Sequence, residues 1–167
     1  MEYFRLMRPY QWIKNLLVLL PAFFAGNLFF SNELFWRVLI AMLTFSLLAS
    51  AVYIFNDFID AEHDRLHQYK RNRPLAKGTV SKISAGILGA ALAITALALS
   101  WFWVPVILPL LGLYIVLSVL YSLFFKRIIV LDILIVSSFY LIRILAGGWS
   151  AKVPVSEWLI LCTIFLA

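Results

Sequence analysis

Long apolar runs alternate with short polar segments along the chain. Runs without a charged residue cover positions 15–32, 38–56 and 83–125. The last run has 43 residues, enough for two membrane spans at about 20 residues each. From this pattern we predict helices over 12–30, 34–64, 81–101, 106–125 and 129–147, and the start of a sixth from Val155. The pattern therefore indicates an all-α, polytopic membrane bundle.

The two ends of the chain differ from the regular spans between them. Residues 1–11 carry aromatic and basic side chains, as segments at a membrane interface do. Pro21 is expected to kink the first helix. Residues 1–167 read as a single membrane domain that stops inside an apolar run, so we expect this sequence to be the first part of a longer protein, inactive by itself.

Composition supports a membrane protein over a soluble domain. Apolar residues make up 64% of the chain, charged residues 13%, and the mean hydropathy is +0.98. The single cysteine, Cys162, excludes a disulfide framework within these residues and a thiolate metal site.

The net charge of +6 is distributed by side of the membrane. Eleven of the 14 Lys and Arg residues lie in the N-terminal segment, in 57–82 and in 126–132, whereas the alternate loops hold only Arg37 and Lys152. By the positive-inside rule, the N-terminus and the segment 57–82 are cytoplasmic. The basic excess is thus a topological signal, and we predict no binding to nucleic acid.

One polar stretch, 56–64, holds four of the eight acidic residues between two apolar runs. On a helix, Asn56, Asp57, Asp60 and Asp64 fall within an arc of about 100°. Carboxylates on one face repel one another unless a cation lies among them, and oxygen ligands suit Mg²⁺.

A basic cluster follows the carboxylates, with the side chains that a polyphosphate needs: Arg65, Lys70, Arg71, Arg73 and Lys77. Together the two groups predict a metal–diphosphate site. The simpler alternative is a solvated loop, but the i, i+3, i+7 spacing of the carboxylates favours a site. His63 and His67 have zinc-binding spacing, yet their carboxylate neighbours favour a harder ion, and we expect His67 to bond a phosphate or the motif.

The fifth predicted helix contains two charged residues, Asp132 and Arg143, which are three turns apart on one face. An arginine in hydrocarbon costs at least about 2.5 kcal/mol, so Arg143 is expected to face a cavity; snorkelling to the interface is the alternative. Gly147 and Gly148 indicate a close backbone approach or a break in the helix, or alternatively the C-terminal cap of the helix.

These motifs resemble the UbiA-type intramembrane prenyltransferase superfamily. The resemblance rests on Asn56-Asp57-x-x-Asp60-x-x-x-Asp64, on Lys70-Arg71-x-Arg73-Pro74, and on Tyr121-Ser122 with Lys126-Arg127 and Asp132. It implies a ring of nine helices around a cavity, with two Asp-rich motifs facing each other on the cytoplasmic side. This chain would supply the first motif and about five and a half helices.

Within the superfamily the chain most resembles the decaprenyl-phosphate phosphoribosyltransferase branch. That similarity rests on Arg8-Pro9-Tyr10-Gln11-Trp12-Ile13-Lys14-Asn15, on Glu62 with Asp64-Arg65 and His67, and on Leu141-x-Arg143-x-x-Ala146-Gly147-Gly148. Gln68 departs from the branch, which commonly has proline after the histidine; the change alters the path of the loop but removes no ligand.

The resemblance implies Mg²⁺-dependent transfer of phosphoribose from phosphoribosyl pyrophosphate to a polyprenyl phosphate such as decaprenyl phosphate. Asp57, Asp60 and Asp64 would be the catalytic metal ligands. The implied substrate-binding residues are Asn56, Lys70, Arg71, Arg73, Lys14, Tyr121, Lys126 and Arg143, with Arg8 a further candidate for the lipid phosphate. The acceptor is already an anion, so no general base is needed.

Two alternatives remain at this point. In the first, the same site binds a prenyl diphosphate and prenylates an aromatic ring or haem. In the second, the polar residues line the ion path of a transporter or belong to a non-catalytic scaffold. For the enzyme we expect a multi-pass protein of the plasma membrane with its active site on the cytoplasmic side, and no oligomeric state is predicted.

Overall fold

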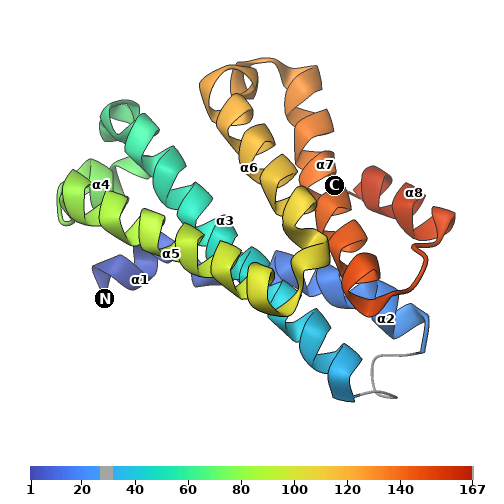
Figure 1. Cartoon of the computed structure of the whole chain (residues 1–167). Helices are drawn as coiled ribbons and strands as arrows, with labels where there is room; N and C mark the ends of the chain where they lie inside the picture. The colour runs from blue at the N-terminus through green and yellow to red at the C-terminus, as the bar shows by residue number, and fades with distance from the viewer. Residues whose placement is uncertain (27–31, 167) are drawn as a thin grey trace.

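The computed structural model describes residues 1–26 and 32–166, and every regular element in these ranges is a helix (Figure 1). In chain order the elements are α1 (Glu2–Met7), η1 (Pro9–Leu19), α2 (Leu20–Phe24), α3 (Asn32–Leu66), η2 (Lys70–Asn72), α4 (Pro74–Lys77), α5 (Lys82–Trp103), η3 (Pro105–Ile107), α6 (Leu108–Leu123), η4 (Phe125–Arg127), α7 (Ile129–Ala151) and α8 (Glu157–Leu166), where η marks a 3₁₀ helix. The all-α prediction is confirmed.

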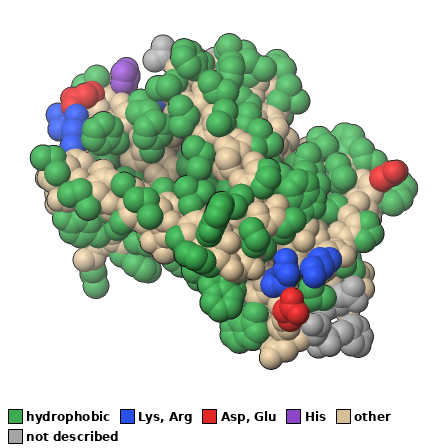
Figure 2. Space-filling view, viewed as in Figure 1, with side chains coloured by type: hydrophobic (Ala, Val, Ile, Leu, Met, Phe, Trp, Pro, Cys, Tyr) green, Lys and Arg blue, Asp and Glu red, His purple; other side chains and the backbone are tan. Residues whose placement is uncertain are grey.

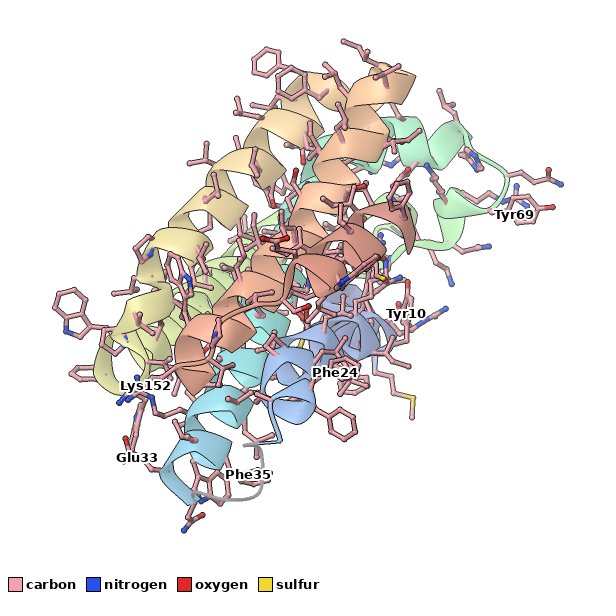
Figure 3. The ribbon with its side chains drawn as sticks, turned by 90° about the vertical axis from the view of Figure 1, so that its right-hand side faces the viewer. Tyr10, Phe24, Glu33, Phe35, Tyr69 and Lys152 are labelled. Atoms are coloured by element: carbon pink, nitrogen blue, oxygen red, sulfur yellow. The ribbon has the colours of Figure 1, made fainter. Side chains whose placement is uncertain are left out.

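Four helices in the described ranges are long and apolar enough to cross a membrane. They are Asn32–Leu66, Lys82–Trp103, Pro105–Leu123 and Val130–Ala151. Each corresponds to a predicted span, with ends within a few residues of the prediction. In Figure 3, Glu33 and Lys152 lie at one end of the bundle and Tyr69 at the opposite end. Residues of the predicted outer loops thus lie at the end of the bundle opposite to the basic segment after α3; which end faces the cytoplasm stays a prediction.

The longest helix, α3, is the centre of the arrangement, and η1, α5 and α7 pack against it. Its first part is apolar and largely buried, whereas its last turns carry the polar stretch 56–64. Because the helix runs without interruption through this stretch, its backbone fixes the spacing of the carboxylates.

The predicted first span over 12–30 is wrong in form, and its residues 27–30 lie outside the described ranges. The described part is a 3₁₀ helix over Pro9–Leu19 followed by the short α2, and Pro21 lies in the first turn of α2 instead of kinking a longer helix. A 3₁₀ helix has three residues per turn, so every third side chain falls on one line. Asn15, Val18 and Pro21 are buried at this spacing.

Hydrogen bonds to the serines of α3 hold the N-terminal segment in place. Trp12 Nε1 donates to Ser50 Oγ at 2.9 Å, and Asn15 Nδ2 donates to Ser46 Oγ at 3.0 Å. Ser50 Oγ in turn donates to the Met7 carbonyl oxygen at 2.8 Å. The Asn15–Ser46 pair is buried and the other two are partly buried. Docking onto these serines therefore favours the 3₁₀ form over the α-helix that the sequence pattern predicts.

Apolar side chains form two buried clusters. The larger joins η1, α2, α3, α6 and α7 around Phe45 and Leu111, and the smaller joins α1, α3, α4 and α5 around Ile54 and Leu75. Apolar side chains also cover most of the face shown in Figure 2, and charged side chains on that face gather mainly near its ends. This distribution is typical of a protein surrounded by lipid.

Gly147 lies inside α7, which continues to Ala151, where Lys152 with φ 56° caps it. The predictions of a helix break and of a C-terminal cap at the glycine pair are therefore wrong, and the close-approach prediction is confirmed. A Cβ on Gly147 would lie 2.1 Å from the Val18 carbonyl oxygen, which is backbone of η1. No such atom fits without separating η1 from α7.

We expect Gly147→Ala to lower the free energy of unfolding by about 1–3 kcal/mol, the usual cost of overpacking. Thermal melting of the detergent-solubilised protein measures this loss of stability. Gly112→Ala on α6 is the matched control, since nothing lies within 4 Å of its added Cβ, and alanine should gain up to about 1 kcal/mol in helix propensity. Equal melting temperatures for the two variants would contradict the close approach.

Candidate functional site

A network of ion pairs surrounds the carboxylates at the end of α3. Asp57, only 2% exposed, accepts hydrogen bonds on Oδ1 from Arg8 Nη2 at 2.6 Å and Arg73 Nη1 at 3.1 Å. Arg73 Nη1 also donates to Asp64 Oδ2 at 2.7 Å, and Asp64 is 4% exposed. Buried carboxylates are costly unless they are paired, so the two arginines are what permits this burial.

A second set of contacts joins α3 to the connection between α6 and α7. Lys126 Nζ donates to Asp60 Oδ1, and Ser122 Oγ donates to Asn56 Oδ1. The side chains of Asp60 and Lys126 are 29% and 27% exposed, so this pair is more accessible to solvent than Asp57. The pairing brings together two of the three segments on which the resemblance to the UbiA superfamily rested, 56–64 and 121–132; the side chain of Arg127 lies outside the described part.

The carboxylate cleft, as we call it, has a volume of about 410 Å³ beside these contacts. It is lined by Ile59, Asp60, His63, Asp64, His67, Lys70, Ser122, Leu123 and Lys126. The structure thus brings together four of the predicted site residues: Asp60 and Asp64 of α3, Lys70 of η2, and Lys126 of the α6–α7 connection. Two carboxylates face two lysines and two imidazoles here, an arrangement suited to a ligand that carries both a metal ion and phosphates.

A tyrosine cleft of about 230 Å³ lies deeper in the bundle. It is lined by Lys14, Val52, Tyr53, Asn56, Tyr114, Ser118, Tyr121, Val136, Phe139, Tyr140 and Arg143. Asn56 lines this cleft, and its partner Ser122 lines the carboxylate cleft, so the two clefts meet at that hydrogen bond. The predicted residues Lys14, Asn56, Tyr121 and Arg143 are therefore brought together.

Arg143 is 4% exposed and is held by neutral partners. Its Nε donates to Asn15 Oδ1 at 2.7 Å, its Nη1 to the Phe139 carbonyl oxygen at 2.6 Å, and its Nη2 to Tyr114 Oη at 3.1 Å. Among the described residues, no carboxylate forms an ion pair with it. The cavity-facing prediction is confirmed and the snorkelling alternative is wrong: the guanidinium carries an un-neutralised positive charge into the tyrosine cleft.

A third cleft, of about 500 Å³, lies toward the N-terminus and includes Asp57, Arg8, Arg73 and Tyr69 in its lining. Arg8 was a candidate for the lipid phosphate; the structure instead pairs it with Asp57. Arg71 is exposed on η2, outside the lining of the three clefts, and its predicted role stays a prediction.

The donor set suits Mg²⁺ in its chemistry. Three carboxylates and an amide oxygen are hard ligands on one face of α3. Within residues 1–26 and 32–166, no three His, Cys, Asp or Glu side chains converge closely enough to hold a metal by themselves. The reason is visible in the network: Arg73 lies between Asp57 and Asp64, and Lys126 is bound to Asp60. Each ion pair engages one oxygen of its carboxylate, so metal binding through the other oxygens stays a prediction.

Sequence reasoning missed Tyr114 and Ser118, which line the tyrosine cleft. They stand at helical spacing on α6 with the predicted Tyr121 and with Ser122, and this polar line within an apolar run is a signal that could have found them. The pairing of Arg8 with Asp57 had no such signal, because it depends on the φ of 52° at Arg8 and on the fold of the N-terminal segment.

Comparison with known proteins assigns the chain to a family. The model of the UbiA prenyltransferase family matches residues 16–167. The chain belongs to this family. A UbiA homolog from Archaeoglobus fulgidus, with a structure bound to DMAPP and Mg²⁺, aligns with a TM-score of 0.81 over 100% of this chain and 60% of that chain, at 21% identity. At that identity the likeness shows the UbiA fold and no more.

Curated relatives share more of the sequence. The decaprenyl-phosphate phosphoribosyltransferase of Mycobacterium tuberculosis (strain H37Rv) is 40% identical over 162 residues, 95% of this chain and 54% of the relative. The enzyme of the same name from Mycolicibacterium smegmatis is 41% identical over 162 residues, 95% of this chain and 51% of the relative. The chain thus spans about half the length of the curated relatives it matches.

Proposed function

We propose that this UbiA-family protein transfers phosphoribose from phosphoribosyl pyrophosphate to a polyprenyl phosphate, with Mg²⁺ as cofactor and pyrophosphate as the second product. The observation that carries the proposal is the junction, at Asn56 and Ser122, of the carboxylate cleft, which holds two lysines beside its carboxylates, with the cationic tyrosine cleft. Such a junction suits a reaction between two phosphate-bearing substrates. The identity of 40% to an enzyme named for this transfer supports the choice of substrates.

The carboxylate cleft would bind the donor. Lys70 and Lys126 line it, and His67 lies beside them. Lys126 is held by Asp60 and is about a quarter exposed, so it can shift toward a phosphate without leaving water entirely. Asp57, Asp60 and Asp64 would hold Mg²⁺, which when bound supplies positive charge to the pyrophosphate.

The tyrosine cleft would bind the acceptor phosphate. Lys14 and Arg143 give it positive charge, and the hydroxyl groups of Tyr53 and Tyr140 can donate hydrogen bonds to anionic oxygens. Because Arg143 is fixed by three neutral partners, its position needs little reorganisation when a phosphate arrives.

The chemistry follows from these positions. An oxygen of the acceptor phosphate forms a bond to the ribose C1, and the C1–O bond to pyrophosphate breaks, with its electron pair leaving on the pyrophosphate. The acceptor oxygen is already ionised, so no side chain has to remove a proton. The residues contribute by orienting two anions and by offsetting the charge on the leaving group.

A prenyltransferase remains the second candidate, favoured by the UbiA homolog structures bound to DMAPP or GPP and Mg²⁺. The same carboxylate cleft would take the diphosphate of that donor. For either activity we propose a plasma-membrane protein whose N-terminus and clefts face the cytoplasm, in line with the distribution of Lys and Arg.

The test is a lipid-extract assay on membranes that contain the native protein. One reaction receives labelled phosphoribosyl pyrophosphate, decaprenyl phosphate and Mg²⁺; the other receives a labelled prenyl diphosphate and aromatic acceptors. We expect label to enter lipid only in the first, and to be lost with EDTA. Transfer only from the prenyl diphosphate would establish the second candidate and refute the first.

A further inference from the structure

Asp57 binds two arginines through a single oxygen. Arg8 Nη2 and Arg73 Nη1 both donate to Oδ1 of Asp57, at 2.6 and 3.1 Å, and the Asp57 side chain is 3% exposed. Within residues 1–26 and 32–166, no other lysine or arginine pairs with this carboxylate. One guanidinium is enough to offset the charge of one buried carboxylate, so the second arginine needs an explanation of its own.

Arg8 is held firmly at Asp57. It joins α1 to η1 in the left-handed conformation, with φ 52° and ψ 56°, which residues with a Cβ rarely adopt. Its carbonyl oxygen accepts a hydrogen bond from Gln11 N at 2.9 Å. Its guanidinium lies over the ring of Tyr53, 5.2 Å from the centroid. The backbone turn and the ring together fix the guanidinium beside the carboxylate.

Arg73 is shared between two carboxylates. It lies between η2 and α4, in the connection that follows α3, and its side chain is 27% exposed. The same Nη1 atom that binds Asp57 also donates to Asp64 Oδ2 at 2.7 Å. Asp64 lines the carboxylate cleft, whereas Arg73 lines the third cleft, toward the N-terminus. To bind a donor phosphate, as the sequence predicts, Arg73 must therefore leave both carboxylates.

The departure of Arg73 affects the two carboxylates differently. Lys70 lines the carboxylate cleft together with Asp64, so Asp64 has another cation in its cleft. Asp57 does not line that cleft, and a buried charged oxygen without a donor is costly. Arg8 remains on the same Oδ1 atom at 2.6 Å. Asp57 thus keeps a partner when Arg73 moves.

We propose that Arg8 is a positioning residue for donor binding: it is the permanent counter-ion of Asp57, and it leaves Arg73 free to turn from Asp57 and Asp64 to the diphosphate group of the donor. This role rests on the proposed function, because it concerns how that donor is bound. Without Arg8, Arg73 is the only cation left on the buried oxygen. Arg73 then stays on Asp57, and the donor loses one charged hydrogen bond.

Binding of Mg²⁺-pyrophosphate tests this role without turnover. Isothermal titration calorimetry of the native protein in detergent should show that Arg8→Gln raises Kd about tenfold, the loss of one charged hydrogen bond. Arg5→Gln is the matched control, because Arg5 lines the same third cleft but pairs with Glu2 instead of Asp57. Its Kd should stay within about twofold of wild type. Unchanged pyrophosphate binding in Arg8→Gln would overturn the proposal.

Transfer kinetics separate this role from direct contact with the lipid. In Arg8→Gln, KM for phosphoribosyl pyrophosphate should rise about tenfold, and KM for decaprenyl phosphate should stay within about twofold. A rise confined to decaprenyl phosphate would show that Arg8 binds the lipid phosphate, and would overturn the proposal. Absence of transfer in wild type would refute the proposed function, whereas pyrophosphate binding would still test Arg8.

Arg8→Lys tests whether Arg8 acts through Arg73. Lysine keeps a charge beside Asp57 but loses the planar guanidinium, so Kd for Mg²⁺-pyrophosphate should rise only about threefold. In an Arg73→Gln background, which lacks the side chain that Arg8 releases, Arg8→Lys should cause no further loss. Equal losses in the two backgrounds would mean that Arg8 contacts the pyrophosphate itself, and would overturn the positioning role.

Discussion

Asp60→Asn in the native protein is expected to lower Mg²⁺-dependent transfer at least about 10²-fold, the range seen when one electrostatic contributor to a transition state is removed. Asp60 lines the carboxylate cleft and is the carboxylate held by Lys126. The amide keeps the size of the side chain but loses the charge that a metal needs. Because Asp60 is partly exposed, stability should change by less than about 0.5 kcal/mol.

Glu62→Gln is the matched control, because it makes the same chemical change two residues away on α3. Glu62 is exposed and pairs with Arg65 and Lys82 outside the cleft. Its removal should leave turnover within about twofold, as for exposed ion pairs in general. The measurements are initial rates against Mg²⁺ concentration, together with Mn²⁺ binding followed by electron paramagnetic resonance. Wild-type turnover in Asp60→Asn would remove Asp60 from the site, and equal losses in both variants would point to a general charge effect.

The sequence predicted the long helices well because hydrophobic periodicity and length decide them. Helix α3 extends two residues beyond the predicted span at each end, and it carries the carboxylates as expected. The spacing of Asp60 and Asp64 predicted that they share a face of the helix, and both line the carboxylate cleft, since the period of an α-helix is fixed by its backbone hydrogen bonds.

What the sequence could not supply depends on contacts between distant segments. The 3₁₀ form of η1 follows from docking onto the serines of α3 and the backbone approach at Gly147, neither of which has a local signature. Likewise, the pairing of Arg8 with Asp57 crosses 49 positions of the chain. The charge pattern indicated that arginines would meet carboxylates, but not that Arg73 would bridge two of them.

Arg143→Met is expected to raise KM for decaprenyl phosphate about 10–100-fold while leaving KM for phosphoribosyl pyrophosphate within about twofold. This is the loss of one hydrogen bond from a charged donor to a phosphate. The hydrogen-bond partners of Arg143 are all neutral: Asn15, Tyr114 and the Phe139 carbonyl. Its charge therefore remains available to an anion, unlike the charges of Arg8 and Arg73, which carboxylates already offset.

Arg143→Lys should give an intermediate KM, because a lysine keeps the charge but loses the planar fork that fixes Arg143 between its three partners. Arg37→Met is the control, because Arg37 lies near the N-terminal end of α3 and pairs there with the exposed Glu33. KM for decaprenyl phosphate and KM for phosphoribosyl pyrophosphate should both be unchanged in that variant. A rise in both KM values for Arg143→Met, with a matching loss of melting temperature, would show that Arg143 only supports the fold. A rise confined to the acceptor would show that a cation buried among neutral partners recognises the phosphate of the lipid.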